Sequence, residues 1–479
     1  MVSVSERVPQ LRQIALGSVC TGRSHGDDSY VSGAVGLLAT PQLFRFVTVS
    51  ESSGGSLRLF RNREFLALAS TAFARSQAYS TIIIALALYA DMFDTTGTVE
   101  GLFGTAFAAA QLLIVLPLGR YIDLRNSKRL LLVGLVVNVG VFVGFTYVSS
   151  VEHVILLRMV QGLGASILWI TGTTVVGEIS PDDSRGLWIG TYNQVGAFSS
   201  LLGDVFGGLL LYLYGFGLTY AVLSMFTVGA FVAVLAALRD DPGGTADPEE
   251  ATGLETIRDL LGRRAIQALV FFRGSFSVGK MAVIIFLPIY ARTGFGINAF
   301  LIGGIMAGGK LTKAVTQGWV GDLTDRVGKR ERFILAGALV YAVGVALIPL
   351  AGFAEGRVPS VTVAGFGAEM ALPGAFFVLF AAYAVLGIGD SLRLPASMAL
   401  FVEEGEYFDA VGSSLSLRSI AWKVGQVGGP VLVGAIWDAT SVLVAFWTAA
   451  AFIVVSTGVF AYLFQVESAP ESVATPADD

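Results

Sequence analysis

Long apolar stretches follow one another from about residue 64 to residue 464, separated by short polar segments. A helix needs about 20 apolar residues to cross the roughly 30 Å hydrocarbon core of a bilayer. Lipid offers no hydrogen-bonding partners, so the backbone of such stretches must satisfy itself within helices. We therefore predict an all-α polytopic membrane protein. The predicted membrane-spanning stretches are twelve: 64–90, 99–118, 130–149, 152–176, 187–213, 217–238, 264–290, 297–319, 332–352, 373–398, 411–437 and 440–464.

The composition agrees with this class and excludes several others. Of 479 residues, 54% are hydrophobic and 14% are charged, whereas soluble domains contain about 25% charged residues. The single cysteine, Cys20, rules out a disulfide framework and a Cys-based metal site, and the two histidines leave no His-rich metal cluster. The net charge of −5 does not favour a nucleic-acid partner. We expect no cofactor and no bound metal.

A charged segment occurs twice, at 119–129 and at 321–330. Each copy has a Gly, an Asp four residues later and then a basic cluster, and each lies between two apolar stretches. The copies begin 202 residues apart (321 minus 119), about half of the apolar region. Two parallel halves of six helices are one of the repeat architectures of secondary transporters. The sequence therefore predicts twelve transmembrane helices in two pseudo-symmetric halves.

The repeat extends beyond the charged segments. The glycine-rich segment 162–166 in the fourth stretch matches 387–391 in the tenth, and 203–208 in the fifth matches 429–434 in the eleventh. The seventh, eighth and tenth stretches contain charged residues, and this correspondence supports their assignment as membrane spans. The predicted organisation has five parts: a cytoplasmic, disordered extension (1–63), an N-terminal six-helix bundle (64–238), a cytoplasmic linker (239–263), a C-terminal six-helix bundle (264–464) and an acidic cytoplasmic tail (465–479).

The linker contains an amphipathic segment, because Leu254, Ile257, Leu260 and Leu261 fall on one helical face. We expect this segment to lie at the membrane surface.

Basic residues near the ends of the stretches set the orientation, because loops rich in Lys and Arg stay in the cytoplasm. One set of loops has little basic character beyond Arg292 and Arg357. We predict a multi-pass protein of the cell (plasma) membrane with both termini cytoplasmic. The basic loops, which we expect to be cytoplasmic, contain Arg58, Arg61, Arg63, Arg120, Arg125, Lys128, Arg129, Arg185, Arg239, Arg258, Arg263, Arg264, Arg326, Lys329, Arg330 and Arg332.

These features resemble the major facilitator superfamily (MFS) of secondary transporters over about residues 64–464. The family has the charged segment Gly-x-x-x-Asp-(Arg/Lys)-x-Gly-x-(Arg/Lys)-(Arg/Lys) after its second span. The first copy departs from it at Leu124 and Asn126, and Asn tolerates the left-handed conformation that Gly would supply. The matching residues are Gly119, Asp123, Lys128 and Arg129 in the first copy, and Gly321, Asp325, Arg326, Gly328 and Arg330 in the second.

The fourth stretch resembles the family pattern Arg-x-x-Gln-Gly-x-Gly-Ala without departure, at Arg158, Gln161, Gly162, Gly164 and Ala165. The fifth stretch resembles a motif of antiporter members but has Asp204 in place of Pro, which leaves symport and antiport both open.

The resemblance implies that Asp123 approaches the N-terminus of the eleventh stretch while the cytoplasmic side is closed. A carboxylate at a helix N-terminus contributes about 0.3–1 kcal/mol when exposed and up to about 2 kcal/mol when partly buried. Asp123 would then act as a latch on alternating access, and the matching residues of the two charged segments would be gating loops. The alternative is that these segments only set the topology.

We place eight basic and two acidic residues near the middle of the predicted spans, where an ionisable residue usually faces a cavity or a partner. A surplus of positive charge in a low-dielectric cavity favours an anion. The alternative is that Lys310, Lys313 and Lys423 extend to the cytoplasmic interface. Under the first interpretation the substrate is a small organic carboxylate or phosphate ester. The substrate-binding candidates are Arg75, Arg273, Lys280, Lys310, Lys313, Asp390, Arg393 and Lys423.

The coupling ion is expected to be H+ or Na+, with Arg158 and Asp204 as candidates that could pair. A purely structural ion pair is the alternative. Asp204 and Asp390 are the acids that we place within the spans.

The sequence thus predicts a monomeric symporter or antiporter for a small molecule in the lipid bilayer. A proton-coupled exporter of drugs or metabolites and a non-transporting membrane sensor on the same fold remain alternatives. A membrane enzyme is not favoured, because paired acids and a Ser/His/Asp arrangement are not seen.

Overall fold

The computed structural model describes residues 52–124, 126–181, 183–240, 254–365, 368–407 and 410–468. Residues 1–51 of the predicted extension, 241–253 of the predicted linker and 469–479 of the predicted tail lie outside these ranges. The helices of the first half are α1 (Ser52–Leu59), α2 (Arg63–Met92), α3 (Gly97–Leu124), α4 (Ser127–Thr146), α5 (Val151–Ile179) and α6 (Arg185–Ala237). The later elements are α7 (Leu254–Gly262), α8 (Arg264–Phe295), α9 (Ala299–Val327), α10 (Arg330–Leu347), η2 (Ile348–Leu350), α11 (Ala351–Ala354), β1 (Val361–Gly365), β2 (Ala368–Leu372), α12 (Gly374–Glu406), α13 (Val411–Ala439) and α14 (Val442–Ser468).

All twelve predicted stretches fall on helical segments, with ends that differ by up to about eight residues, and the ninth stretch continues from α10 through η2 into α11. Stretches five and six share the long α6, which bends at Gly215, where φ is +69° and ψ is −163°. Only Gly adopts such a backbone conformation readily. Eight of the described helices are long and apolar enough to cross a membrane, with α6 counted once. The chain is an all-α multi-pass membrane protein, as predicted.

In each charged segment one helix ends and the next begins, but the backbone conformation between the two helices differs. In the second, Gly328 ends α9 with φ +68°, the left-handed conformation expected of Gly. In the first, Asn126 has φ −61° and ψ 107°, and its side chain accepts a hydrogen bond from the Arg129 backbone N–H. The expected left-handed role of Asn126 is therefore wrong. Its side chain instead satisfies a free N–H at the start of α4, which is the usual task of an N-cap Asn.

Equivalent close approaches occur in the two halves. A Cβ on Gly162 of α5 would lie 2.3 Å from the Phe107 carbonyl oxygen of α3. A Cβ on Gly387 of α12 would lie 2.3 Å from the Gly309 carbonyl oxygen of α9. Both glycines belong to the matching glycine-rich segments, so the repeat in sequence is a repeat in helix packing.

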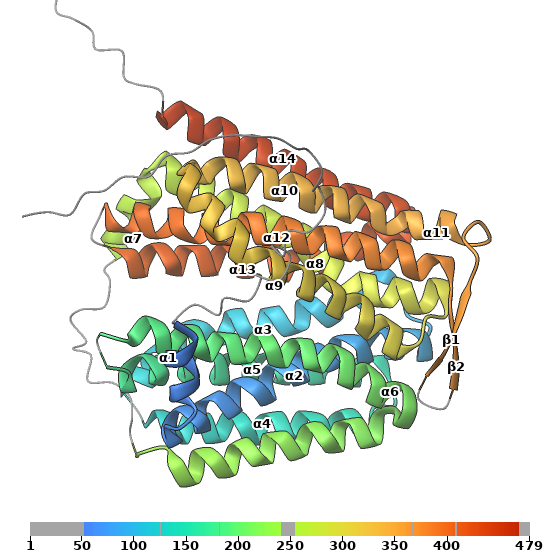
Figure 1. The fold of residues 1–479 in the computed structure, drawn as a ribbon, viewed down its shortest axis with the longest axis horizontal. Coiled ribbons are helices and arrows are strands. Elements are labelled where there is room, and N and C mark those ends of the chain that lie inside the picture. The colour runs from blue at the N-terminus through green and yellow to red at the C-terminus, as the bar shows by residue number, and fades with distance from the viewer. Residues whose placement is uncertain are drawn as a thin grey trace, which may run out of the picture. The chain divides into compact units, whose positions relative to one another are not determined.

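The helices run along a common direction in two groups (Figure 1). The lower group contains α2, α4, α5 and α6, and the upper group contains α8, α10, α12 and α14. One end of the described part carries α1 and α7, and we call it the linker end. The other carries β1 and β2, and we call it the hairpin end. The antiparallel hairpin pairs Val361 with Leu372, in a loop for which no structure was predicted.

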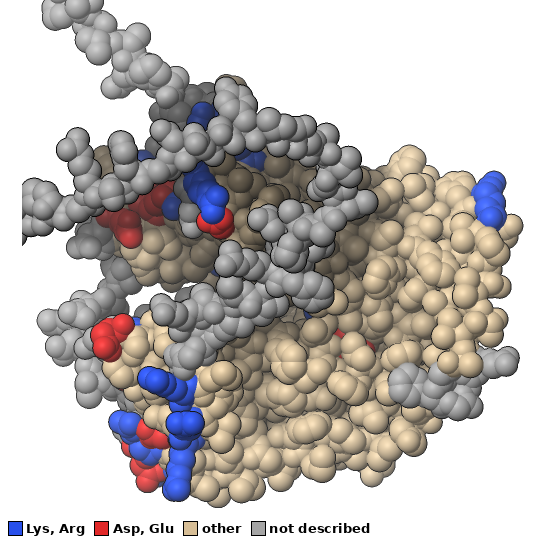
Figure 2. Space-filling model, viewed as in Figure 1, with Lys and Arg blue, Asp and Glu red and all other residues tan. Residues whose placement is uncertain are grey.

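On the face shown in Figure 2, the visible surface between the two ends is almost free of charge. Basic and acidic side chains gather at the linker end on the face shown. Large apolar side chains are exposed along the helices between them, including Val136, Leu156, Phe198, Met225 and Val455. Such a continuous apolar surface fits the hydrocarbon core of a bilayer.

Candidate functional site

A cavity of about 200 Å³ lies between the two halves of the chain. The helix α9 presents four residues to it at positions 306, 309, 310 and 313, and α12 presents 383, 386, 387 and 390. Both sets have the i, i+3, i+4, i+7 spacing of one helix face. The lining residues are Tyr79, Ser80, Ile83, Ser200, Lys280, Ile284, Met306, Gly309, Lys310, Lys313, Tyr341, Tyr383, Leu386, Gly387 and Asp390.

Lys310 connects the two halves across this cavity. Its Nζ lies 2.6 Å from Oδ2 of Asp204 in α6, and the Asp204 side chain is fully buried. The same ammonium donates hydrogen bonds to Ser80 Oγ at 2.9 Å and to Ser200 Oγ at 2.7 Å. A buried carboxylate requires such a partner, because an unpaired charge in the interior costs several kcal/mol. Lys310 and Asp204 therefore form a polar contact whose two ends belong to different halves.

Asp390 lies between two cations of the second half. It accepts a hydrogen bond from Arg393 at 2.6 Å on its own helix, as its spacing predicts, and it forms an ion pair with Lys280 of α8. The Arg393 side chain is fully buried, with its guanidinium 3.7 Å from the centre of the Phe276 ring. One carboxylate thus neutralises only part of the charge of its two partners.

The cavity has a surplus of positive charge. Its lining contains three lysines, Lys280, Lys310 and Lys313, and one described carboxylate, Asp390. Beyond the lining, Arg393 pairs with Asp390, and Asp204 pairs with Lys310. No hydrogen bond or ion pair of the Lys313 ammonium is found within the described part of the chain. This side chain is the cation most available to a ligand.

Four of the predicted substrate residues, Arg75, Arg273, Arg393 and Lys423, are not among those that line the cavity. The Arg75 guanidinium lies 4.6 Å from the centre of the Trp169 ring, and that of Arg273 lies 4.2 Å from the centre of Trp422. Lys423 of α13 donates a hydrogen bond to Gln111 of α3, so this lysine also connects the two halves.

The expected pairing of Arg158 with Asp204 is wrong. Arg158 donates to the Phe103 carbonyl at 2.9 Å and to Gln161 Oε1 at 2.6 Å. Its side chain is directed at α3, whereas Asp204 lies where α6 packs against α9 and meets Lys310. Spacing along one helix does not reveal an acid on another, so Asp204 was not recognised as the partner of Lys310.

The count of charges within the spans was also incomplete. Glu100, in the first turn of α3, is only 4% exposed, and Arg418 lies within α13. The cavity also contains hydroxyl groups that no sequence pattern predicted, those of Tyr79, Ser80, Ser200, Tyr341 and Tyr383. Tyr383 could have been found, since it lies seven residues before Asp390 on the same helix face.

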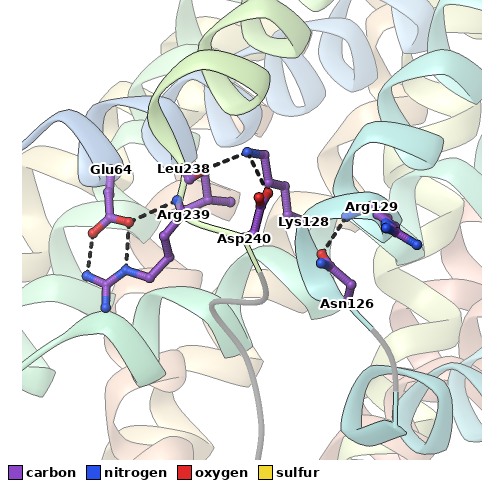
Figure 3. A network of polar contacts seen from close by, with 7 residues as sticks. All are labelled: Glu64, Asn126, Lys128, Arg129, Leu238, Arg239 and Asp240. Atoms are coloured by element: carbon purple, nitrogen blue, oxygen red, sulfur yellow. Dashed lines mark hydrogen bonds and ion pairs between the residues drawn. The ribbon is translucent and has the colours of Figure 1, made fainter.

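The first charged segment contributes to a polar network at the linker end (Figure 3). Lys128 donates to the Leu238 carbonyl at 2.7 Å and to Asp240 Oδ1 at 3.1 Å. Next to it, the guanidinium and backbone N–H of Arg239 donate to the Glu64 carboxylate at the start of α2. These contacts tie the end of α6 to the starts of α2 and α4, all in the first half.

In the second charged segment, Arg326 pairs with Asp322 on its own helix at 2.7 Å, and Arg330 pairs with Glu403 of α12. The helix α9 includes Gly321, which has open space around it. The side chains of Gly119, Asp123 and Asp325 lie outside the described part of the chain. The predicted contact of Asp123 with α13 therefore stays a prediction.

Comparison with known proteins supplies the family. The model of the Major Facilitator Superfamily matches residues 68–374. The chain is 26% identical over 283 residues to the uncharacterized MFS-type transporter YuxJ of Bacillus subtilis (strain 168), covering 56% of this chain and 70% of that protein. It is 23% identical over 373 residues to the multidrug resistance protein MdtG of Escherichia coli O9:H4 (strain HS), covering 76% of this chain and 85% of that protein.

Solved structures show the same fold. A bacterial homologue of the human lysosomal transporter Spinster, in an inward-facing and unoccupied conformation, aligns with a TM-score of 0.63 and 15% identity over 83% of this chain and 94% of that one. The nucleoside transporter NupG aligns with a TM-score of 0.66 and 12% identity over 84% of this chain and 99% of that one.

Proposed function

Because the chain belongs to the Major Facilitator Superfamily, we propose that it is a secondary active transporter that carries a small organic anion by alternating access. The observation that carries this proposal is the convergence of Lys280, Lys310 and Lys313 on one cavity between the halves. In a low-dielectric site, uncompensated positive charge attracts an anion more strongly than the same charge does in water. A carboxylate or phosphate ester is the chemistry that such ammonium groups recognise.

The size of the cavity supports a small substrate. Its volume of about 200 Å³ lies below the roughly 300–1,000 Å³ of pockets that take drug-sized ligands. The hydroxyls of Tyr79, Tyr341 and Tyr383 supply neutral hydrogen-bond donors beside the lysines. These groups can orient the uncharged part of an anion.

Coupling to an ion gradient follows from the Lys310–Asp204 pair. An anion that binds Lys310 competes with Asp204 for the same ammonium. A carboxylate that loses its partner inside the protein is then stabilised by taking up H+ or Na+. In this scheme Asp204 is the coupling group, Lys310 links it to the substrate, and Arg158 holds α3 and α5 together.

The orientation proposed from the basic loops places the linker end in the cytoplasm of a plasma-membrane protein. Ion pairs at that end, such as Glu64–Arg239 and Arg330–Glu403, join helices of the same half. Among the described residues, the polar contacts between the halves lie in the middle, as at Lys310, and at the hairpin end, where Arg292 of α8 pairs with Asp91 of α2 at 2.9 Å. This arrangement supports a conformation closed at the outer side. We propose that the monomer is the functional unit.

Flux into liposomes tests the proposal. Purified protein is reconstituted, and uptake of labelled monocarboxylates, dicarboxylates and phosphate esters is measured with an imposed H+ or Na+ gradient and without one. We expect at least one anion class to accumulate only with a gradient. Transport limited to cations or to neutral solutes would contradict the anion proposal, and ligand binding without flux would favour a sensor on the same fold.

A proton-coupled exporter of drugs or metabolites is the second candidate, because MdtG is described as a multidrug resistance protein. The aromatic lining at Tyr79, Tyr341 and Tyr383 could accommodate an apolar compound. Efflux of lipophilic cations from cells that express the chain, abolished by a protonophore, would favour this candidate over anion transport.

A further inference from the structure

A second cavity, of about 270 Å³, lies at the hairpin end. Its polar groups include four carboxyl side chains, Asp91, Asp94, Glu100 and Asp438. It shares no lining residue with the central cavity. The remaining lining residues are Ala90, Thr95, Thr96, Gly97, Thr293 and Trp437.

Asp438 joins the two halves at this cavity. Its Oδ1 accepts a hydrogen bond from the Gly97 backbone N–H at 2.6 Å. Its Oδ2 accepts from the Thr98 backbone N–H at 2.8 Å and from the Thr98 hydroxyl at 2.6 Å. The carboxylate at the end of α13 thus caps the N-terminus of α3, where free N–H groups and the helix dipole favour negative charge.

The Glu100 carboxyl group lies at the same helix N-terminus but accepts fewer hydrogen bonds than Asp438 does. Its side chain is 4% exposed, and its only described hydrogen bond is a long one of 3.4 Å from the Thr95 hydroxyl to Oε1. Its Oε2 is buried and has no hydrogen-bond partner among the described residues. A buried carboxyl oxygen without a partner is costly unless something neutralises it.

The charges around Glu100 do not neutralise it. On the side of α13 it faces the Asp438 carboxylate, and Asp94 follows α2 in the lining. Arg292 of α8 pairs with Asp91 of the lining. Three carboxyl groups, those of Asp94, Glu100 and Asp438, therefore share this cavity without a paired cation in the described structure.

From this geometry we propose that the cavity is a binding site for a small monovalent cation, which neutralises Glu100 beside Asp438 and stabilises the contact of α13 with α3. The described residues contain no group of three or more His, Cys, Asp or Glu that could hold a metal ion, so a proton is the simplest such cation. A proton on Oε2 and an alkali ion between the carboxylates have the same electrostatic effect.

The proposal goes beyond the central cavity. It assigns a cation to a place remote from the Lys310–Asp204 pair, at a contact that must separate if the hairpin end opens. A bound cation removes the repulsion between two carboxylates across that contact. Occupancy of this site would therefore hold the hairpin end closed, whichever solute the central cavity carries.

Trp437 lines the cavity and reports on it. Tryptophan fluorescence of the purified full chain is titrated with NaCl and with KCl at fixed pH, and with pH in choline chloride, which keeps the ionic strength constant. The same titrations on Glu100→Gln test whether the cation binds at Glu100. Those on Trp437→Phe test whether the fluorescence change comes from Trp437. The matched control is Glu152→Gln, because Glu152 also lies in the first turn of a helix that starts at this end but is exposed.

We expect a saturable change either with an alkali ion, whose midpoint shifts about tenfold or more in Glu100→Gln, or with H+, whose transition is lost in Glu100→Gln. Glu152→Gln should respond as the wild type does. Saturation with NaCl or KCl identifies an alkali ion, and saturation with pH alone identifies a proton. As a readout independent of fluorescence, the same cation should raise the thermal unfolding temperature of the wild type and not that of Glu100→Gln. A response to neither ion nor pH, or equal responses of wild type and Glu100→Gln, would overturn the proposal. Because no step measures flux, failure here is distinguishable from failure of anion transport.

Discussion

Lys310 of α9 places its ammonium 2.6 Å from the buried carboxylate of Asp204 in α6. The pair links the two halves at the middle of the bundle, beside the central cavity. Lys310 is 30% exposed and also binds two serine hydroxyls, whereas Asp204 is fully buried and depends on the lysine. The two partners therefore differ in what they lose when the pair is broken.

Lys310→Met should destabilise the protein more than Asp204→Asn. The first variant leaves a buried carboxylate without its cation, and breaking a buried pair in this way costs about 3–5 kcal/mol. The second leaves a partly solvated ammonium that retains Ser80 and Ser200. Thermal unfolding of the purified proteins measures the difference.

The double variant Lys310→Met/Asp204→Asn is the control for this prediction. It should recover most of the stability lost in Lys310→Met, because no unpaired charge remains, while ion-coupled uptake stays abolished. Equal unfolding temperatures for the two single variants would show that the pair is not buried as described.

The fold was predictable from sequence because a bilayer demands long apolar helices, and each helix can be recognised alone. The half-length repeat of charged and glycine-rich segments fixed the two halves and the helices that carry charge. The hairpin of β1 and β2 was not predictable, because ten strand residues in a loop carry no hydrophobic constraint comparable to that of a span.

The central site was predictable only in part. The lysines at 280, 310 and 313 were recognised as charges that need a cavity or a partner, and they line one cavity. Their partners were not recognised correctly, because pairing between helices depends on the rotation of each helix. Arg158 and Asp204 lie on neighbouring stretches, yet one is directed at Phe103 of α3 and the other at Lys310 of α9.

Lys313→Gln should weaken anion transport without affecting folding. The Lys313 ammonium has no described partner to lose, so its removal leaves no unpaired charge behind. It lines the central cavity, so the Michaelis constant for an anion should rise by about tenfold, the equivalent of about 1.4 kcal/mol. Initial rates of uptake into liposomes over a range of substrate concentrations give this constant.

Lys329→Gln is the matched control for Lys313→Gln, since Lys329 is an exposed lysine between α9 and α10. Its removal should leave uptake and unfolding temperature unchanged. If both variants transport the anion as the wild type does, Lys313 does not contact the substrate.

Asp390→Asn should be among the most destabilising single changes in the second half. The substitution leaves two cations, Lys280 and Arg393, close together without their shared carboxylate. Arg393 is fully buried, so its charge cannot be solvated by a change of rotamer. A loss of several kcal/mol is expected on the scale of other broken buried pairs, and thermal unfolding in detergent measures it.

Asp390→Glu is the control for this prediction, because it tests whether the negative charge or the exact position of the carboxylate matters for stability. It keeps the carboxylate, so it should retain more stability than Asp390→Asn. An Asp390→Asn variant with wild-type unfolding temperature would mean that Lys280 and Arg393 are neutralised by another group.

Gly434→Ala should open the hairpin end. A Cβ at this position of α13 would lie 2.1 Å from the Gly97 carbonyl oxygen of α3, so the two helices must separate where Asp438 caps α3. Gly428→Ala on the same helix is the matched control, since a Cβ there meets nothing within 4 Å. Ala is ordinarily more favourable than Gly within a helix by about 0.5–1 kcal/mol, so this control should be neutral or slightly stabilising. The accessibility of a cysteine at Thr98, in a Cys20→Ser background, to an impermeant thiol reagent reports on the opening. The reaction should be several-fold faster in Gly434→Ala than in Gly428→Ala, and equal rates would show that α3 and α13 do not form the closed contact at this end.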